Sequence, residues 1–180
     1  MKKISRFQPD SRWVRYDAKS QMWIPNRKRI YLYWYKYLQI VLSDYKNNLN
    51  WEIYSEWGTP EEILTTPFDI WWSKHWKNLF GYAEGKAPKY SISTIRPKTD
   101  AIRYALLVHQ NRHRGNNWEI AKWLQHQEST KRGIPIPSFA YASSGVSAGI
   151  EDKMIIQSRV GRYKSLSNQI IKNVCQGVFP

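Results

Sequence analysis

The segment TTPFDIWWSKHWKNLFG, residues 65–81, constrains the fold of this chain more than any other stretch. Its large apolar and aromatic residues recur at the three- and four-residue spacing that places side chains on one face of an α-helix. Thr66 is expected to cap this helix in a Thr-x-x-Asp pattern that Asp69 completes. Pro67 suits the first helical position, and Gly81 is expected to end the helix. The aromatic face consists of Phe68, Trp71, Trp72, His75, Trp76, Leu79 and Phe80.

Two interpretations of this aromatic face are open, a buried core and a platform on which nucleotide bases stack. A stacking platform needs exposed rings mixed with Lys or Arg that follow the nucleic-acid backbone. Here the polar residues are segregated on the opposite side of the helix, which favours packing into a core. Docking of a protein partner or a second copy of the chain on part of the aromatic face is a further alternative. The polar side consists of Asp69, Ser73, Lys74, Lys77 and Asn78.

A second aromatic segment precedes the first. Residues 27–45 are apolar on nearly every side of a helix, which predicts a central helix buried on most of its surface. Their β-branched and aromatic side chains also permit strands. A short helix is expected over residues 51–57, and a second short turn begins at Thr59. These segments together predict an aromatic-cored helical domain over residues 27–82.

Two stretches rich in small residues, Gly and Pro divide the rest of the chain, at residues 83–96 and 129–150. The first is expected to link two halves, and the second is expected to be a loop. Residues 97–180 are therefore expected to form a C-terminal helical unit. Its helices are expected to run from a cap at Thr99 or Asp100 to residue 113, from a cap at Asn117 to residue 127, and over residues 151–177.

Basic residues exceed acidic ones, with 28 Lys and Arg against 14 Asp and Glu, which gives a formal net charge of +14. Such an excess favours a polyanionic partner, above all nucleic acid, over a small neutral substrate. The charge is uneven along the chain. Residues 1–30 carry nine basic and two acidic residues, whereas residues 51–66 carry four glutamates and no basic residue. The N-terminal end is therefore expected to contact phosphate.

An anionic membrane surface is the competing polyanion. No apolar run approaches the roughly 20 residues of a membrane-spanning helix, and no signal-peptide pattern is present. We therefore expect a soluble, intracellular protein of the bacterial cytoplasm or of a phage, with no membrane partner. The single cysteine, Cys175, cannot form an internal disulfide, which suits a reducing compartment.

The sequence contains no pattern that predicts an enzyme, a metal or a cofactor. His109 and His113 lie four residues apart, but Gln110 stands where a metalloprotease needs Glu, and no third ligand lies at a suitable spacing. No Gly-rich phosphate-binding motif and no nucleophile elbow are present. We therefore expect no catalytic residues, no bound metal and no cofactor.

Two segments of the C-terminal half resemble the helix-turn-helix family of DNA-binding proteins. In NNWEIAKWLQHQ, the residues Ile120, Ala121 and Leu124 match the Ile-Ala-x-x-Leu core of the first helix of that motif. SRVGRYKS, residues 158–165, resembles the start of a recognition helix, although some twenty residues separate the two segments. The resemblance implies that Arg159 and Arg162 contact base edges, while Ser158 and Lys164 contact phosphates. Two ordinary amphipathic helices with solvated basic residues are the alternative.

The basic, tryptophan-rich chain with the segment IIKNVCQGVFP is also similar to phage and plasmid proteins that have no assigned activity. The fold class that we expect is mainly α: an aromatic-cored helical bundle with a basic N-terminal arm or hairpin over residues 1–26 and a C-terminal helix-turn-helix-like unit.

The expected function is non-enzymatic binding of nucleic acid, with double-stranded DNA favoured over RNA. The alternatives are an architectural subunit of a phage or mobile-element nucleoprotein assembly, and an RNA-binding protein. The expected nucleic-acid contacts are Lys2, Lys3, Arg6, Arg12, Arg15, Arg27, Lys28, Arg29, Arg112, Arg114, Lys131, Arg132, Ser158, Arg159, Arg162 and Lys164.

Overall fold

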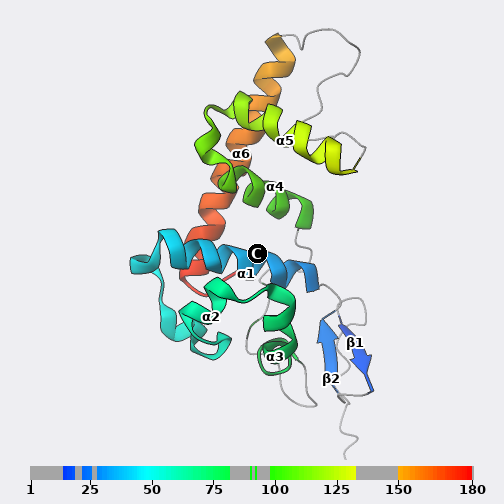
Figure 1. Ribbon diagram of the computed structural model, residues 1–180, viewed down its shortest axis with the longest axis vertical. Helices are drawn as coiled ribbons and strands as arrows, with labels where there is room; N and C mark the ends of the chain where they lie inside the picture. Colours follow the sequence, from blue (N-terminus) through cyan, green and yellow to red (C-terminus); the bar gives the residue numbers. More distant parts are fainter. Residues whose placement is uncertain are drawn as a thin grey trace, which may run out of the picture. The chain divides into compact units, whose positions relative to one another are not determined.

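The computed structural model describes residues 14–18, 22–25, 28–81, 90, 92, 98–132 and 150–179. Over these residues the fold is mainly helical, as the sequence predicts, with one short β-hairpin (Figure 1). The chain divides into two compact units, which we call unit 1 (residues 1–97 and 170–180) and unit 2 (residues 98–169). The sequence led us to expect residues 170–180 in the C-terminal unit, whereas they belong to unit 1.

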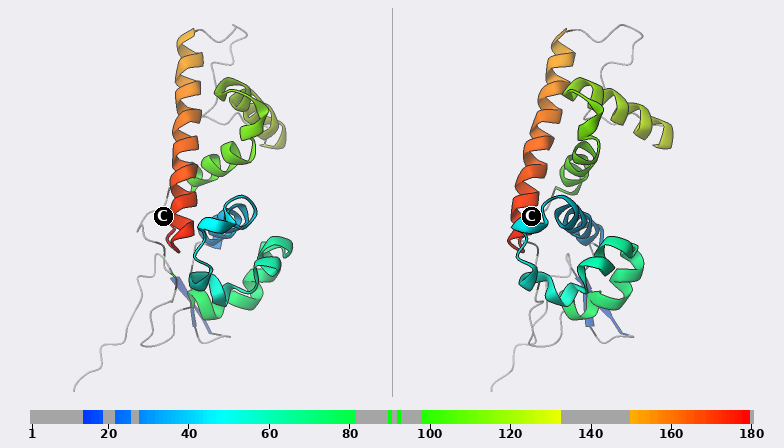
Figure 2. Two further views of the ribbon diagram at one scale, coloured as in Figure 1. Left: turned by 90° about the vertical axis from the view of Figure 1, so that its left-hand side faces the viewer. Right: turned by 60° about the vertical axis from the view of Figure 1, so that its left-hand side comes forward.

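The described part of unit 1 begins with the hairpin. Strands β1 (Val14–Asp17) and β2 (Met22–Pro25) pair antiparallel, with Val14 opposite Pro25 and Asp17 opposite Met22. The helices that follow are α1 (Lys28–Asp44), the 3-10 helices η1 (Lys46–Asn48) and η2 (Trp51–Trp57), α2 (Pro60–Thr65) and α3 (Phe68–Phe80). In both views of Figure 2, α2 and α3 lie together on one side of α1.

Helix α1 is the centre of unit 1. The side chains of Trp34, Tyr35 and Tyr37 are almost fully buried, so the expectation of a helix covered on most sides is correct. The buried rings contact one another at the tilted and edge-to-face angles that aromatic pairs prefer. For example, the ring centroids of Trp34 and Trp57 lie 5.2 Å apart at 56°. The core of unit 1 is therefore mainly aromatic.

The aromatic face of α3 packs into this core. Trp71, Trp72, Leu79 and Phe80 are buried, and the indole Nε1 of Trp71 donates a 2.6 Å hydrogen bond to the carbonyl of Trp57. The core interpretation of these residues is confirmed, and a stacking platform built on the two buried tryptophans is wrong. The remaining members of the face are half-buried: Phe68, His75 and Trp76.

The expected cap of α3 is wrong. Thr66 ends α2 instead: its backbone N–H donates to the carbonyl of Glu62, and α3 follows Pro67 without a side-chain cap. The capped helix is α2, where the hydroxyl of Thr59 accepts from the backbone N–H of Glu62 at 3.1 Å. Thr66 therefore ends α2, although the sequence predicted that it would cap α3.

Residues 170–179 complete the core of unit 1. The ring of Phe179 is fully buried and stacks on Trp34, with centroids 5.4 Å apart and 9° between the planes. The hydroxyl of Tyr54 donates to the carbonyl of Val174 at 2.8 Å and accepts from the indole of Trp34. A segment distant in sequence thus fills the centre of unit 1.

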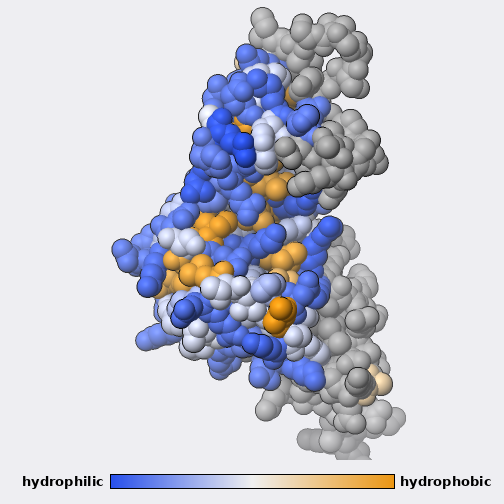
Figure 3. Space-filling view, in the orientation of Figure 1, coloured by the Kyte–Doolittle hydropathy of each residue, from blue (hydrophilic) through white to orange (hydrophobic). Residues whose placement is uncertain are grey.

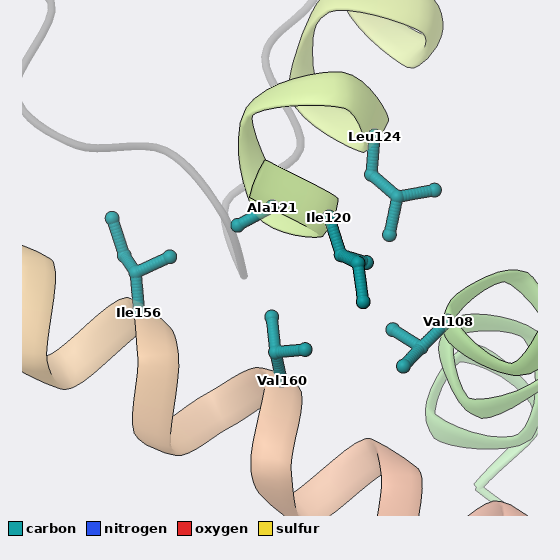
Figure 4. Close-up of a cluster of buried hydrophobic side chains, with 6 residues drawn as sticks. All are labelled: Val108, Ile120, Ala121, Leu124, Ile156 and Val160. Atoms are coloured by element: carbon teal, nitrogen blue, oxygen red, sulfur yellow. The ribbon is translucent and has the colours of Figure 1, made fainter. Parts of the chain in front are cut away.

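Unit 2 consists of α4 (Thr99–Gln110), the 3-10 helix η3 (Arg112–Arg114), α5 (Asn117–Arg132) and residues 150–169 of α6 (Ile150–Cys175). Its core is aliphatic. One cluster takes side chains from all three α-helices, which point to a common centre in Figure 4. The cluster consists of Val108, Ile120, Ala121, Leu124, Ile156 and Val160.

The caps of unit 2 also differ from the expectation. Neither Thr99 nor Asp100 caps α4, which follows Lys98 without a side-chain cap. Asn116, not Asn117, caps α5, because its Oδ1 accepts from the backbone N–H groups of Trp118 and Glu119 at 2.9 and 3.1 Å. Across the described part of the chain, no helix combines the length and apolarity needed to cross a membrane.

Candidate nucleic-acid interface

The predicted contact residues fall into three groups. Two of them, Lys28 and Arg29, lie at the start of α1 in unit 1. Six lie in unit 2: Arg112, Arg114, Ser158, Arg159, Arg162 and Lys164. The predictions for Lys2, Lys3, Arg6, Arg12 and Arg27 lie outside the described residues, as do the side chains of Arg15, Lys131 and Arg132.

Lys28 has a structural partner. Its ammonium forms an ion pair with Asp69 on α3 and lies 5.6 Å from the ring centroid of Phe68. Both charged groups are exposed, so the pair adds about 0–1 kcal/mol to stability. In this arrangement Lys28 joins α1 to α3, which makes it a weaker candidate for phosphate binding than the residues of unit 2.

A turn between α4 and α5 presents three consecutive basic side chains. We call Arg112, His113, Arg114 and Gly115 the basic turn; the three side chains are exposed. Asn111 immediately precedes the basic turn and is only 7% exposed. Its amide nitrogen donates to the carbonyl of Leu107 at 2.8 Å. The basic turn is therefore held on a buried, hydrogen-bonded side chain.

Gly115 ends the basic turn in a backbone conformation that side chains rarely allow. Its φ of 121° and ψ of −147° lie in a region that is essentially restricted to glycine. This conformation lets the chain reverse before Asn116 caps α5. The position of the three basic side chains thus depends on a glycine that the sequence analysis did not single out.

Arg114 is fixed by two side chains. Its Nε donates to Oδ1 of Asn111 at 2.8 Å, and its guanidinium carbon lies 3.9 Å from the ring centroid of Trp123. Trp123 in turn packs against the aliphatic cluster of unit 2. Arg112 is held more loosely, through a 3.0 Å bond from Nη1 to the carbonyl of His109. The guanidinium of Arg114 is therefore oriented by the core beneath it.

The described exposed surface of α6 combines polar side chains with two apolar ones, Met154 at 64% and Ile155 at 48% exposure. Ser158, Arg162 and Ser165 are exposed at the four- and three-residue spacing of one helical face, while Val160 is buried on the other side. Residues 153–180 contain no Asp or Glu. In Figure 3, most of the coloured surface near the upper end of α6 is hydrophilic.

The position of this face in its helix differs from the expectation. Residues 158–165 do not begin a helix; they lie about two turns inside α6, which starts at Ile150. Arg159 and Lys164 are half-buried beside the exposed face, and Arg162 points most clearly to solvent. A recognition helix that enters a groove by its first turn would therefore need other residues at its tip.

A shallow open hollow of about 820 Å³ joins this face to the start of α5. The amide of Asn117 donates to the carbonyl of Gln157 at 3.1 Å, which fixes α5 against α6. Gly161 lies beside this contact, since a β-carbon there would stand 3.6 Å from the amide nitrogen of Asn117. The lining residues are Asn116, Asn117, Gln157, Ser158, Gly161, Arg162 and Ser165.

The hollow brings together two predicted residues, Ser158 and Arg162, with five that the sequence analysis missed. The signals that could have found the others are the adjacent asparagines at the helix start and the glycine within α6. The lining offers hydroxyls, amides and one guanidinium, and no carboxylate or apolar side chain. Phosphate oxygens in nucleic-acid complexes commonly accept hydrogen bonds from these groups.

A second polar cluster lies in unit 1. Oε1 of Glu62 is 3.3 Å from the ammonium of Lys74 and 3.5 Å from Nε2 of His75. Burial alone would raise the pKa of Glu62, but the hydrogen bonds and charges of its two partners outweigh it and lower the pKa. The cluster joins α2 to α3. No group of three or more potential metal ligands occurs within the described residues.

The chain matches no known protein-family model, no curated protein and no solved structure. The resemblance to the helix-turn-helix family therefore stays a prediction.

Proposed function

We propose that the protein binds nucleic acid, preferably double-stranded DNA, without catalysing a reaction, and that unit 2 is the principal contact surface. The observation that carries this proposal is the basic turn together with the adjoining hollow. Three exposed basic side chains lead directly, through Gly115, into a surface of hydrogen-bonding groups that lacks any carboxylate.

Charge supports the same assignment. Residues 98–169 carry eleven Lys and Arg against five Asp and Glu. The acidic residue next to the basic turn, Glu119, is paired with Lys122 at 2.9 Å. Little negative charge therefore opposes a phosphate backbone at this surface, and each neutralised phosphate would release counterions.

Within this surface, the basic residues and hydroxyls would hold the phosphates, and Arg162 is the best candidate for a base edge. An arginine can make two hydrogen bonds to the major-groove edge of guanine. The basic N-terminal stretch would add phosphate contacts, which is the role that its nine basic residues favour.

The test is the affinity for duplex DNA, measured by fluorescence anisotropy over a series of salt concentrations. We expect affinity to fall steeply as salt rises. Arg162→Glu should weaken binding by about tenfold or more, because it removes a cation and adds a repelling charge. Lys77→Glu is the matched control, since Lys77 is exposed on α3 of unit 1 and the change in net charge is the same.

Absence of binding to any duplex, or an affinity that salt does not change, would contradict the proposal. Equal losses for the two variants would remove the assignment to unit 2. Tighter binding to single-stranded RNA than to duplex DNA would select RNA as the partner instead.

A second candidate function is an architectural subunit of a nucleoprotein assembly. Three large apolar side chains in the described part of unit 1 face solvent, with Leu64 44%, Ile70 53% and Val178 44% exposed. Exposed apolar residues of this kind suit a contact with protein. Light scattering of the protein and of Ile70→Asp tests this function: an oligomer that the substitution dissociates would support it, and a monomer in both cases would count against self-association.

A further inference from the structure

We propose that Arg114 is a preformed clamp for one phosphodiester group of the nucleic-acid backbone. The inference rests on the proposed function and assigns the residue that makes its best-oriented phosphate contact. The guanidinium is restrained by its neighbours, leaves its terminal nitrogens available and lies among basic side chains.

The restraint acts on one edge and one face of the guanidinium. Asn111 accepts the Nε–H at 2.8 Å, and the ring of Trp123 lies 3.9 Å from the guanidinium carbon. Asn111 is itself tied to α4 through the carbonyl of Leu107, and Trp123 is tied to the aliphatic core. An arginine held in this way loses little further rotamer freedom when it binds a ligand.

The terminal nitrogens, Nη1 and Nη2, stay available. Neither has a hydrogen-bond partner among the described residues, and a ligand can reach them because the side chain is exposed. Two parallel N–H groups match two oxygens of a phosphate, and such bidentate pairs are among the strong hydrogen bonds of proteins. The side of Arg114 that is not used for packing therefore has the geometry of an anion clamp.

The surroundings favour a phosphodiester over a protein carboxylate. Arg112 and His113 project from the same turn, and the nearby carboxylate of Glu119 is occupied by Lys122. The start of α5 is not part of the clamp, because Asn116 already caps its backbone N–H groups. The hollow begins at Asn116, so a polyanionic backbone held at Arg114 could continue over its hydrogen-bonding groups toward Arg162.

Covering Trp123 is the other role that Arg114 could have. The long stem of an arginine or a lysine shields an aromatic ring from water, and both carry a positive charge. Only arginine provides the planar pair of N–H groups. Arg114→Lys therefore retains the cover and the charge but removes the clamp.

The experiment compares Arg114→Lys and Arg114→Gln with the unsubstituted protein in binding to duplex DNA across a salt series. Arg103→Lys is the matched control, because Arg103 also stacks on an aromatic ring of unit 2, 5.5 Å from the centroid of Tyr104. We expect Arg114→Lys to weaken binding by about tenfold with little change in the salt slope, since the charge is kept. Arg114→Gln should also lower the salt slope by about one. Arg103→Lys should leave both quantities unchanged.

Urea midpoints of all variants, followed by circular dichroism, separate a loss of fold from a loss of binding. Unchanged affinity in Arg114→Lys and an unchanged salt slope in Arg114→Gln, in a protein that still binds DNA, would overturn the clamp and leave the proposed function intact. Vesicles containing anionic lipid and inorganic phosphate form the other arms. Binding to either one that depends on Arg114, without binding to DNA, would overturn the assignment to nucleic acid.

Discussion

The two units of this protein achieve burial by different means. Unit 1 buries tryptophan and tyrosine rings around α1, whereas the core of unit 2 is a small cluster of Val, Ile, Leu and Ala. Their charge is also distributed differently. The basic excess of unit 1 lies in residues 1–30, with nine basic and two acidic residues, whereas residues 31–97 carry seven of each; residues 98–169 of unit 2 carry eleven and five. The aromatic residues that first attract attention thus lie where the charge is balanced, and the candidate binding surface lies on the plainer unit.

The difference teaches that aromatic richness and ligand binding should be judged separately. Rings that pack against one another cannot also stack on bases, and the exposed chemistry of unit 2 comes from arginine, serine and amide side chains. Trp123 is informative in this respect, because one ring serves the core of unit 2 and also orients Arg114.

The largest expected effect comes from removing a buried ring of unit 1. Trp71→Ala should lower the free energy of unfolding by about 3–5 kcal/mol, because it leaves a cavity and removes the hydrogen bond to Trp57. Trp76→Ala, on the same helix but half-buried, should cost about 1 kcal/mol or less. Urea unfolding followed by circular dichroism measures both. Similar losses would contradict the assignment of the core to one side of α3.

A pH titration tests the tyrosines of the same core. Burial, and secondarily the charge of Glu62, raise the pKa of Tyr35 from 10.0 to about 12. The neutral hydroxyl shares its single hydrogen between the carbonyl oxygens of Ile63 and Thr66, at 2.9 and 2.7 Å, and the ionised form cannot donate. The unfolded protein therefore releases this proton first, so the stability contribution is complete below pH 10 and is lost as pH rises toward 12.

The expected loss from Tyr35 is about 2 kcal/mol over that interval. Circular dichroism of urea-unfolding series at several alkaline pH values measures it, and Tyr35→Phe is the control, because it cannot ionise. A variant with the same alkaline loss as the unsubstituted protein would assign the effect to other groups.

The smallest effect concerns Gly161 in unit 2. A β-carbon at this position would meet the amide of Asn117 at 3.6 Å, an ordinary contact, so Gly161→Ala should raise stability by about 0.5–1 kcal/mol. DNA affinity should stay nearly unchanged, whereas Gly161→Leu should weaken binding by partly filling the hollow. Thermal unfolding and anisotropy test the pair. Wild-type affinity in Gly161→Leu would show that the hollow does not take part.

The helices of this chain could be predicted because their apolar residues repeat at the helical period. That pattern identified α3 and its buried face, and it also identified α1 despite side chains that permit strands. It could not locate the caps, because neighbouring residues compete for the same role. Thr66 ends α2 rather than starting α3, and Asn116 rather than Asn117 caps α5.

The candidate site was only partly predictable for a related reason. Its basic residues stand out in the sequence, but the hollow depends on a contact between Asn117 and Gln157, which are 40 residues apart. The orientation of Arg114 likewise depends on Asn111 and Trp123, whose roles follow from tertiary packing. A charge pattern therefore indicates the class of ligand, and the packing beneath it decides which cations are held in place.

The insertion of residues 170–179 into unit 1 has a consequence for the order of folding. Tyr54 and Val174 are joined by a hydrogen bond although 120 residues separate them. The ring of Trp34 likewise stacks on that of Phe179, near the other end of the chain. During synthesis the earlier helices emerge well before the segment that closes their core. Contacts of such long sequence separation slow folding, because a large loop must close before they form. A nascent chain released to residue 97 would therefore expose aromatic surface, and unit 1 can finish folding only after unit 2 has been translated.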